Sequence, residues 1–436
     1  MQIYSQGNLI TLTEEQERLV ELAVREFNMG SKLFQYSAPA GCGKSVVLHA
    51  IVEQLGLTED QIAPMAYMGS ASMVMRKNGF STAKTCHSWL YEPRTKQKLN
   101  PYTNKIQSNI DYVKRKLPPE IELIVIDEGS MVPDYIKEVI DWNKRPVLVC
   151  GDLNQLPPID GESAYLNNTP KTPVYTLSQI MRQDVNSEIV QLSRKLLEGI
   201  DPVPGQYGNQ VIIIDYSDLT KDMLLSADVV ITATNKTREY FISKIRNYLG
   251  YHSQLPQYGE KVVCRENKWN IEVDGINPVN GMSGICKNLN WDITQLDPET
   301  SKATFNLDFS PTMFPDITFN KLKCDYQYFI SDQVTRRKIK EMEEQNPYIP
   351  SYNKFEFGYA VTTHMSQGNQ FDTGIFIEES LRSSDSRKLK YTGITRFAKK
   401  CIYVVSKKRF HSVFNRVFFP SVQIPATVQE EITQIK

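Results

Sequence analysis

Short apolar runs alternate with amphipathic segments through the first 175 residues of the chain. Four runs have the length of a β-strand, and they lie at 33–38, 62–68, 122–127 and 145–152. The segments between them, such as 43–55, carry apolar residues at helical spacing. Buried strands separated by helices are typical of a parallel sheet covered on both faces. The pattern predicts an α/β domain over residues 1–175.

A second alternating block follows and is interrupted in its middle. Its apolar runs and helical segments lie at 211–215, 228–250, 357–367, 373–379 and 399–406. We expect a second α/β domain made of residues 176–255 and 351–436. The fold class is therefore α/β, with two parallel sheets.

The residues between the two parts of the second domain have a different pattern. Residues 256–350 hold short strand-like runs separated by turn residues, which favours a small inserted β-barrel. Within it, Asn280-Gly281 predicts a tight hairpin. The segment 330–346 predicts an exposed helix.

Composition narrows the class of protein. The chain has 436 residues, of which 41% are hydrophobic and 23% charged, as in ordinary globular proteins. No apolar run approaches the ~18 residues that span a bilayer, and the first residues lack the pattern of a secretory signal. The seven scattered cysteines form no CxxC pair, so we expect buried, reduced thiols and no structural zinc. These features favour a cytoplasmic protein without membrane contacts.

Charge is balanced overall but not locally. The 50 basic and 50 acidic residues give a net charge of zero. Residues 94–116 nevertheless hold seven basic side chains and one acid, and residues 381–409 hold ten and one. Each block alone could be a solvated face. Two such blocks beside candidate enzyme motifs favour a track for a polyanion.

A candidate phosphate site follows the first predicted strand. The stretch SAPAGCGKS at 37–45 lies between that strand and an amphipathic helix, where backbone N–H groups and a helix N-terminus can bind an anion. Its glycines allow close approach, its lysine reaches the outer phosphates, and its serine can ligate Mg²⁺. An alanine replaces the usual first glycine, which a negative φ would permit. The predicted nucleotide-binding residues are Ala38, Pro39, Ala40, Gly41, Cys42, Gly43, Lys44 and Ser45.

Further catalytic candidates follow at the ends of later strands. The run ELIVID delivers Asp127 to hold Mg²⁺ and Glu128 to accept a proton from the attacking water. Gln155, beside the rigid Pro157-Pro158, can detect the γ-phosphate. Arg182 and Arg396 can balance the negative charge of phosphoryl transfer, because a guanidinium binds phosphate oxygens in pairs.

The ordered series SAPAGCGKS, ELIVIDEGSM, GDLNQLPP, MRQD, YAVTTHMSQGNQFD and TGITRFAKK resembles superfamily 1 helicases, and more narrowly the RecD-like group that includes the bacteriophage Dda helicase. The resemblance covers residues 11–406. It implies two RecA-like domains that hydrolyse ATP with Mg²⁺ in the cleft between them. It also implies a monomeric DNA helicase that moves 5′ to 3′ on single-stranded DNA and opens forked DNA. A single-strand DNA-binding protein is a candidate partner, and a role in DNA replication or recombination, bacteriophage origin and location in the host cytoplasm are further implications.

The resemblance also assigns residues. Gln16 would contact the adenine, Gln367 and Gly368 would approach the phosphates, and Arg182 and Arg396 would be arginine fingers. The implied contacts to nucleic acid are Ser70, His87, Tyr102, Asn235, Thr362, Thr363 and His364. A hairpin inserted at about 91–118 would split the duplex, and the barrel at 256–350 would be SH3-like.

Two departures from the family pattern concern the DNA track. Tyr67 and Met68 stand where the family shows Pro-Thr, while Ser72 and Met365 stand near or at positions that usually carry lysine. Two alternative functions therefore stay open. One is a single-strand translocase that remodels bound proteins, and the other is an RNA helicase.

Overall fold

The computed structural model describes residues 1–5, 8–99, 106–158, 162–166, 169, 172–179, 187–268, 270–288, 293–296, 303–345, 351–380 and 385–405. Contacts divide the chain into two compact units. The first comprises Met1–Cys86, Pro118–Leu249 and Ala360–Lys436, and the second comprises His87–Leu117 and Gly250–Tyr359. Both predicted parallel sheets belong to the first unit, and both predicted insertions belong to the second.

The first sheet is a six-stranded parallel sheet with the order β10-β3-β9-β8-β4-β5. Its strands are β3 (Leu33–Ser37), β4 (Ile62–Ala66), β5 (Lys84–Thr85), β8 (Leu123–Asp127), β9 (Val147–Gly151) and β10 (Val174–Thr176). The four predicted apolar runs are therefore the four central strands, and the α/β prediction is confirmed. Every residue of β4, β8 and β9 is buried, which explains why these runs are continuously apolar.

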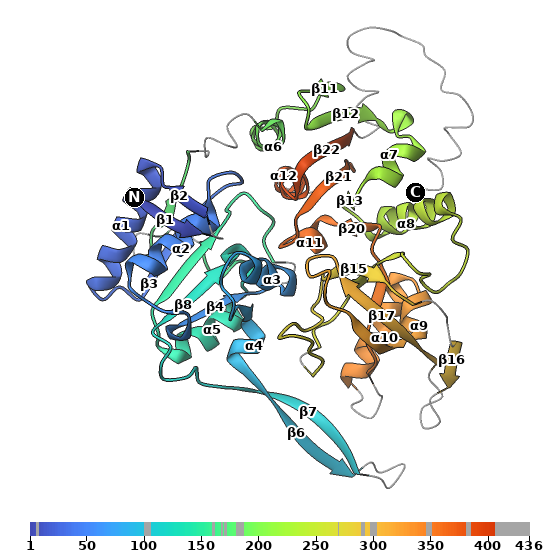
Figure 1. Cartoon of the computed structure of the whole chain (residues 1–436), viewed down its shortest axis with the longest axis horizontal. Helices are drawn as coiled ribbons and strands as arrows, with labels where there is room; N and C mark the ends of the chain where they lie inside the picture. Colours follow the sequence, from blue (N-terminus) through green and yellow to red (C-terminus); the bar gives the residue numbers. More distant parts are fainter. Residues whose placement is uncertain are drawn as a thin grey trace. The chain divides into compact units, whose positions relative to one another are not determined.

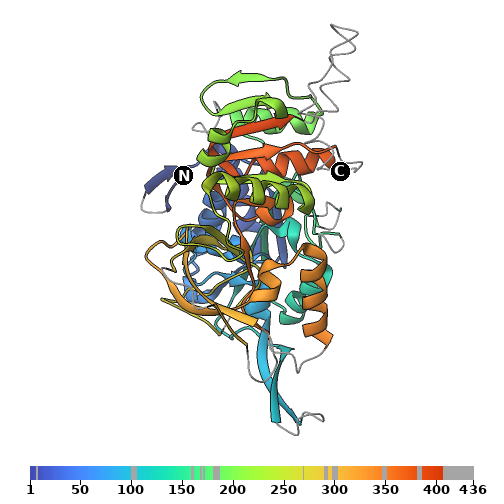
Figure 2. The ribbon, with the colours of Figure 1, turned by 90° about the vertical axis from the view of Figure 1, so that its right-hand side faces the viewer.

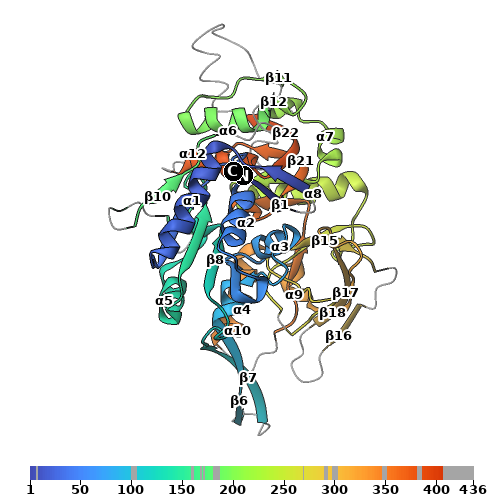
Figure 3. The ribbon, with the colours of Figure 1, turned by 60° about the vertical axis from the view of Figure 1, so that its left-hand side comes forward.

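Helices accompany this sheet (Figure 3). They are α1 (Glu14–Asn28), α2 (Lys44–Gln54), α3 (Gly69–Lys77), α4 (Cys86–Leu90) and α5 (Asp134–Asn143). A capping box starts α1: Thr13 accepts a bond from the backbone N–H of Gln16, whose side chain in turn accepts one from the N–H of Thr13. A short antiparallel pair, β1 (Gln2–Ser5) and β2 (Asn8–Thr11), precedes α1 and was not predicted.

The second sheet has the order β11-β12-β22-β21-β13-β20 (Figure 1). Its strands are β11 (Gly205–Tyr207), β12 (Val211–Asp215), β13 (Val229–Thr232), β20 (Ala360–Thr362), β21 (Phe371–Ile377) and β22 (Phe397–Val405). All its pairs are parallel except β11 with β12. The helices of this part are α6 (Glu188–Glu198), α7 (Lys221–Ser226), α8 (Asn235–Leu249), α11 (Thr363–Ser366) and α12 (Ser386–Ile394).

The second unit contains a hairpin and an antiparallel sheet. The hairpin pairs β6 (Tyr91–Leu99) with β7 (Ile106–Lys114) as a two-stranded ribbon (Figure 2). The sheet consists of β14 (Lys261–Cys264), β15 (Ser283–Cys286), β16 (Ile293–Leu296), β17 (Ala303–Pro311), β18 (Phe319–Asp325) and β19 (Phe355–Phe357), with helices α9 (Tyr326–Ile330) and α10 (Gln333–Gln345). The assignment of this sheet as an SH3-like barrel stays a prediction.

Two sequence expectations for the insertion are corrected. Its end was placed at residue 350, but β19 pairs with β14 and extends the unit to Tyr359. Asn280-Gly281 does not form a tight hairpin, because the strands that flank it, β14 and β15, are joined by a long connection. Gly281 instead donates its N–H to the carbonyl of Cys264 just before β15 begins. The predicted helix at 330–346 is confirmed as α10.

The structure also bears on the predictions about cysteines, metal sites and membrane-spanning helices. All seven cysteines are buried and unpaired, as expected for reduced thiols. Within the described ranges, no group of three or more His, Cys, Asp or Glu side chains is arranged to hold a metal ion. The helices in those ranges are also too short or too polar to cross a membrane.

Candidate active site

The loop that joins β3 to α2 has the backbone of a phosphate site. Gly41 and Gly43 adopt φ angles of 82° and 74°, in the left-handed region that favours glycine. Helix α2 starts directly after Gly43, so its free N–H groups face the loop. Ala38 has a negative φ and donates its N–H to the carbonyl of Gly151 at 2.8 Å. Alanine therefore fits at the position where a glycine is usual.

Lys44 lies between two carboxylates at the end of β8. Its Nζ is 2.8 Å from Oδ1 of Asp127 and 2.9 Å from Oε1 of Glu128. Burial opposes the charge on Lys44, but the two carboxylates outweigh that effect and raise its pKa. Burial likewise works to raise the pKa of Asp127, yet the nearby lysine holds that pKa below its usual range. The three side chains form one buried charged centre.

The two carboxylates have different surroundings. Asp127 Oδ1 also accepts hydrogen bonds from the N–H of Glu128 at 2.7 Å and from Sγ of Cys150 at 3.2 Å. Glu128 has a φ of 52°, a strained value for a residue with a Cβ. Its Oε2 is buried and makes no hydrogen bond. Glu128 is thus held in a costly conformation with an acceptor oxygen available.

The loop after β9 carries the predicted sensor. Gln155 is 5% exposed, and its Oε1 is buried without a hydrogen-bond partner. Asp152, at the start of the same loop, is also buried. Burial raises the pKa of Asp152, and a hydrogen bond from Tyr391 partly opposes that shift. The loop after β9 therefore contains a second buried acceptor oxygen that makes no hydrogen bond.

Residues of α12 and of the segment after α11 form hydrogen bonds with this loop and with the P-loop. The hydroxyl of Tyr391 donates to Oδ2 of Asp152 at 2.6 Å and accepts the N–H of Ala40 at 3.0 Å. Thr392 Oγ1 accepts the N–H of Leu156 at 3.0 Å. Gln367 Nε2 donates to the carbonyl of Leu156 at 3.0 Å, while its own Oε1 has no partner.

The remaining predicted nucleotide contacts differ in how they are placed. Gln16 is 1% exposed, and its side-chain Nε2 donates a hydrogen bond to the carbonyl of Cys42 at 2.9 Å. This bond stabilises the P-loop. Arg396 follows α12 and bonds to Thr392 and Thr395 of its own segment. Gly368 has a φ of 73° and lies against α3. Arg182 lies outside the described residues.

The predicted nucleic-acid contacts are not all accessible. Ser70 is 2% exposed and donates to the carbonyl of Gln367, and Thr363 is fully buried and donates to the carbonyl of Thr232. Thr362 caps α11 through the N–H of Met365. His364 is half-buried, and burial lowers its pKa. Thr362 is itself buried, so His364 is the one of these four residues that is partly accessible.

Two further predicted contacts lie on other elements, and Tyr102 lies outside the described residues. The ring of His87 stacks on that of Tyr91 with centroids 5.8 Å apart, and burial lowers the pKa of His87. Asn235 is exposed at the first turn of α8. The N–H and hydroxyl of Thr234 just before it bind the carboxylate of Glu379. A phosphate at this helix end would therefore meet a negative charge.

Sequence reasoning missed several residues around the site. A hollow of about 270 Å³ lies beside the P-loop and is lined by Pro39, Ala40, Asn154, Thr176, Leu177, Ser178, Ser193, Arg194, Leu197 and Tyr391. Tyr391 directly precedes the motif TGITRFAKK, which contains Arg396, so its position next to that motif was a usable signal. Arg194 donates to the carbonyl of Ser178 and had no such signal.

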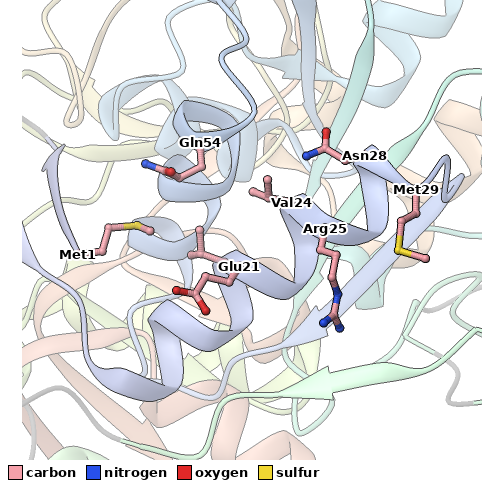
Figure 4. Close-up of a pocket in the computed structure, with 8 residues that line it drawn as sticks. Met1, Glu21, Val24, Arg25, Asn28, Met29 and Gln54 are labelled. Carbon is pink, nitrogen blue, oxygen red and sulfur yellow. The ribbon is translucent and has the colours of Figure 1, made fainter.

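A larger hollow of about 430 Å³ lies elsewhere, along α1 (Figure 4). Its lining residues are Met1, Val20, Glu21, Val24, Arg25, Asn28, Met29 and Gln54. It shares none of these residues with the P-loop site. The charged centre and the free acceptor oxygens described above single out the P-loop and the strand ends beside it as the candidate active site. The smaller hollow adjoins this site at Pro39 and Ala40.

Comparisons with known proteins agree with this geometry. The AAA domain family matches residues 11–211. The chain is 28% identical over 416 residues to the ATP-dependent RecD2 DNA helicase of Deinococcus radiodurans, covering 88% of this chain and 48% of the relative. It is 24% identical over 440 residues to the uncharacterised protein MJ1519 of Methanocaldococcus jannaschii, covering 85% and 36%. The chain thus spans about half or less of these curated relatives.

Solved structures show the same fold. A structure of two coordinating Pif1 helicases at forked DNA matches with a TM-score of 0.53 and 17% identity, covering 94% of this chain and 97% of that one. Bacteroides Pif1 with ADP-AlF3 and single-stranded DNA matches with a TM-score of 0.50 and 16% identity, covering 94% and 98%. At these identities the two solved structures show the fold alone, and the chain is similar along most of its length to the RecD2 helicase.

Proposed function

We propose that this protein is an ATP-dependent DNA helicase that moves 5′ to 3′ on single-stranded DNA and unwinds duplex ahead of it. The observation that carries the proposal is the charged centre of Lys44, Asp127 and Glu128. Beside it, Tyr391 and Thr392 of α12 and Gln367 after α11 bind the P-loop and the loop after β9. A P-loop whose surroundings include both sheets can link hydrolysis to relative motion of the sheets.

The P-loop residues have separate tasks in this proposal. Lys44 moves from the carboxylates to the outer phosphates of ATP, which the free N–H groups of the loop also bind. Glu128, released from Lys44, accepts a proton from the attacking water. Gln155 accepts a hydrogen bond from that water through its free Oε1 and orients it.

The arrangement also fits a divalent cation. The charged centre has a buried acceptor oxygen without a hydrogen-bond partner at Glu128, and Gln155 and Gln367 each have another. Ser45 and Asp127 would hold Mg²⁺, which would offset the charge of the phosphates. Arg396 and Arg182 would stabilise the charge that develops on the γ-phosphate, a role worth about 10³–10⁵ in rate in GTPases.

The proposed strand path uses six residues. They are Tyr67, His87, Tyr102, Asn235, Thr362 and His364. The hairpin β6–β7 would separate the duplex, and residues 94–116 would attract its phosphates. We further propose that the protein acts as a monomer, in DNA replication or recombination of a bacteriophage, and that a single-strand DNA-binding protein is a partner.

Steady-state ATPase measurements test this function. Rates are compared without polynucleotide, with oligo-dT and with an RNA oligomer of equal length. We expect strong stimulation by DNA only, followed by strand displacement from substrates with a 5′ tail and not from those with a 3′ tail. Equal stimulation by RNA would assign the protein to RNA. DNA stimulation without strand displacement would favour the single-strand translocase.

A further inference from the structure

Tyr391 occupies a position that the sequence motifs do not explain. Its side chain belongs to α12 and is 1% exposed. A phenol has one proton, and here that proton is donated to Asp152 at 2.6 Å. The phenol oxygen then accepts the N–H of Ala40 at 3.0 Å. One hydroxyl thus joins three segments: the P-loop, the loop after β9, and α12.

The second half of the same connection lies at Leu156. Its N–H is bound by Thr392, the residue after Tyr391, and its carbonyl is bound by Gln367. The loop that carries Gln155 is therefore bound at both ends. Tyr391 of α12 binds Asp152, and Thr392 of α12 and Gln367 after α11 bind Leu156. Arg396 follows on the segment that ends α12, a little more than one helical turn after Tyr391.

The hydrogen bonds that join Tyr391 to Asp152 and Ala40 are buried, and they include a carboxylate. Asp152 is 1% exposed, and its other hydrogen bond goes to the N–H of Asn154. Removing the hydroxyl of Tyr391 would leave both a buried carboxylate oxygen and the N–H of Ala40 without this partner. Unmade hydrogen bonds in such surroundings are costly, so the segments would lose their common position.

We infer that Tyr391 is a positioning residue, which sets Arg396 and Gln155 relative to the P-loop and so couples nucleotide occupancy to the second sheet. The inference rests on the proposed ATPase function. Because Ala40 belongs to the phosphate-binding loop, a nucleotide that rearranges this loop changes the bond to Tyr391. The change then reaches α12, and with it the affinity for the strand.

The substitution Tyr391→Phe tests the inference, because it removes the hydroxyl and keeps the ring. We expect DNA-stimulated kcat to fall about tenfold or more, with KM for ATP changed less than about threefold. The ratio of single-strand affinities with and without a non-hydrolysable ATP analogue should approach one. Tyr403→Phe is the matched control, since Tyr403 is also fully buried and lies in β22, the next strand after α12. It should leave all three quantities near wild type.

Two further sets of variants distinguish a loss of positioning from a general folding defect. Asp152→Ala removes the acceptor of the Tyr391 proton and should reproduce the loss of kcat, whereas Asp152→Asn keeps an acceptor and should restore part of it. The double variant Tyr391→Phe with Arg396→Lys should lose less kcat than the product of the two single losses, because part of the effect of Tyr391 acts through Arg396.

The outcomes separate the inference from the proposed function. Wild-type protein without DNA-stimulated ATPase would contradict the proposed function itself. A stimulated wild type together with an unchanged kcat and affinity ratio in Tyr391→Phe would overturn only the role of Tyr391. A loss of kcat that Tyr403→Phe shares would also overturn it, since any buried hydroxyl would then suffice.

Discussion

Lys44 contributes a positive charge between two carboxylates that are 8% and 11% exposed in their side chains. Burying a carboxylate is costly unless a cation lies beside it. Here the lysine supplies that cation. The charge balance changes when Lys44 turns to a phosphate, which leaves Glu128 as the freer base. The same three residues thus serve folding in one state and chemistry in the other.

Glu128→Gln is the sharper test of the catalytic assignment, because it keeps the shape of the side chain and removes the base. Hydrolysis should slow by about 10²–10⁴-fold, the usual contribution of a general base. Nucleotide binding should persist, since the P-loop is unchanged. Steady-state ATPase with oligo-dT, together with the affinity for an ATP analogue, measures both. A normal rate in this variant would remove Glu128 from the mechanism.

Lys44→Ala should behave differently. It leaves Asp127 and Glu128 buried without their cation, and breaking a buried ion pair costs about 3–5 kcal/mol. We expect loss of nucleotide binding and a lower free energy of unfolding in urea. Lys137→Ala provides the control, because its ion pair with Asp141 is exposed. An equal cost in both variants would show that the charged centre does not stabilise the fold.

At the scale of elements, α3 and the segment after α11 pack very closely. Gly368 has a φ of 73°, and a Cβ there would lie 2.8 Å from both the N and the Cβ of Ala71. Ser70 of the same helix donates to the carbonyl of Gln367. The resemblance places Gly368 near the phosphates, and the packing explains independently why a glycine is required.

Gly368→Ala should therefore cost more than its backbone strain alone. Gly56 offers a matched control, because its φ is 70° and nothing lies within 4 Å of its missing Cβ. Alanine in the left-handed region costs about 1–2 kcal/mol at either site. Overpacking should add about 1–3 kcal/mol at Gly368 only. Urea unfolding of both variants gives the difference, and equal costs would mean that the segment can move away from α3.

Helices and strands could be predicted where the local pattern of apolar residues determined the structure. The strands β3, β4, β8 and β9 followed from apolar runs because both faces of each strand are buried. Asn280-Gly281 does form a local turn, in which Met282 donates its N–H to the carbonyl of Val279. The dipeptide does not make a tight hairpin, because a long segment separates it from the end of β14. The contact of Tyr391 with Ala40 spans 351 positions. No periodicity or local motif encodes a contact at that separation, so the candidate site could be named but its internal connections could not.

At the scale of the whole chain, the residues of the candidate active site and the hairpin belong to different units. The P-loop, both carboxylates and α12 lie in the first unit, whereas β6 and β7 lie in the second. The hairpin strands pair with each other along their whole length, from Tyr91 with Lys114 to Leu99 with Ile106. The hairpin can therefore be shortened at a paired position without touching the residues that bind ATP.

Replacing residues 96–109 by Asn-Gly keeps the pair of Thr95 and Ile110 and closes it with a favoured two-residue turn. DNA-stimulated ATPase should stay within about twofold of wild type, while strand displacement should fall about tenfold or more, because separation and hydrolysis are assigned to different elements. The full-length variant with Lys96 and Lys98 changed to Gln separates charge from length. It should weaken DNA binding mainly at low salt and make the affinity less salt-dependent, yet still unwind. Unchanged displacement by the shortened protein would exclude the hairpin as the separating element, and loss of ATPase as well would make it part of the strand-binding track.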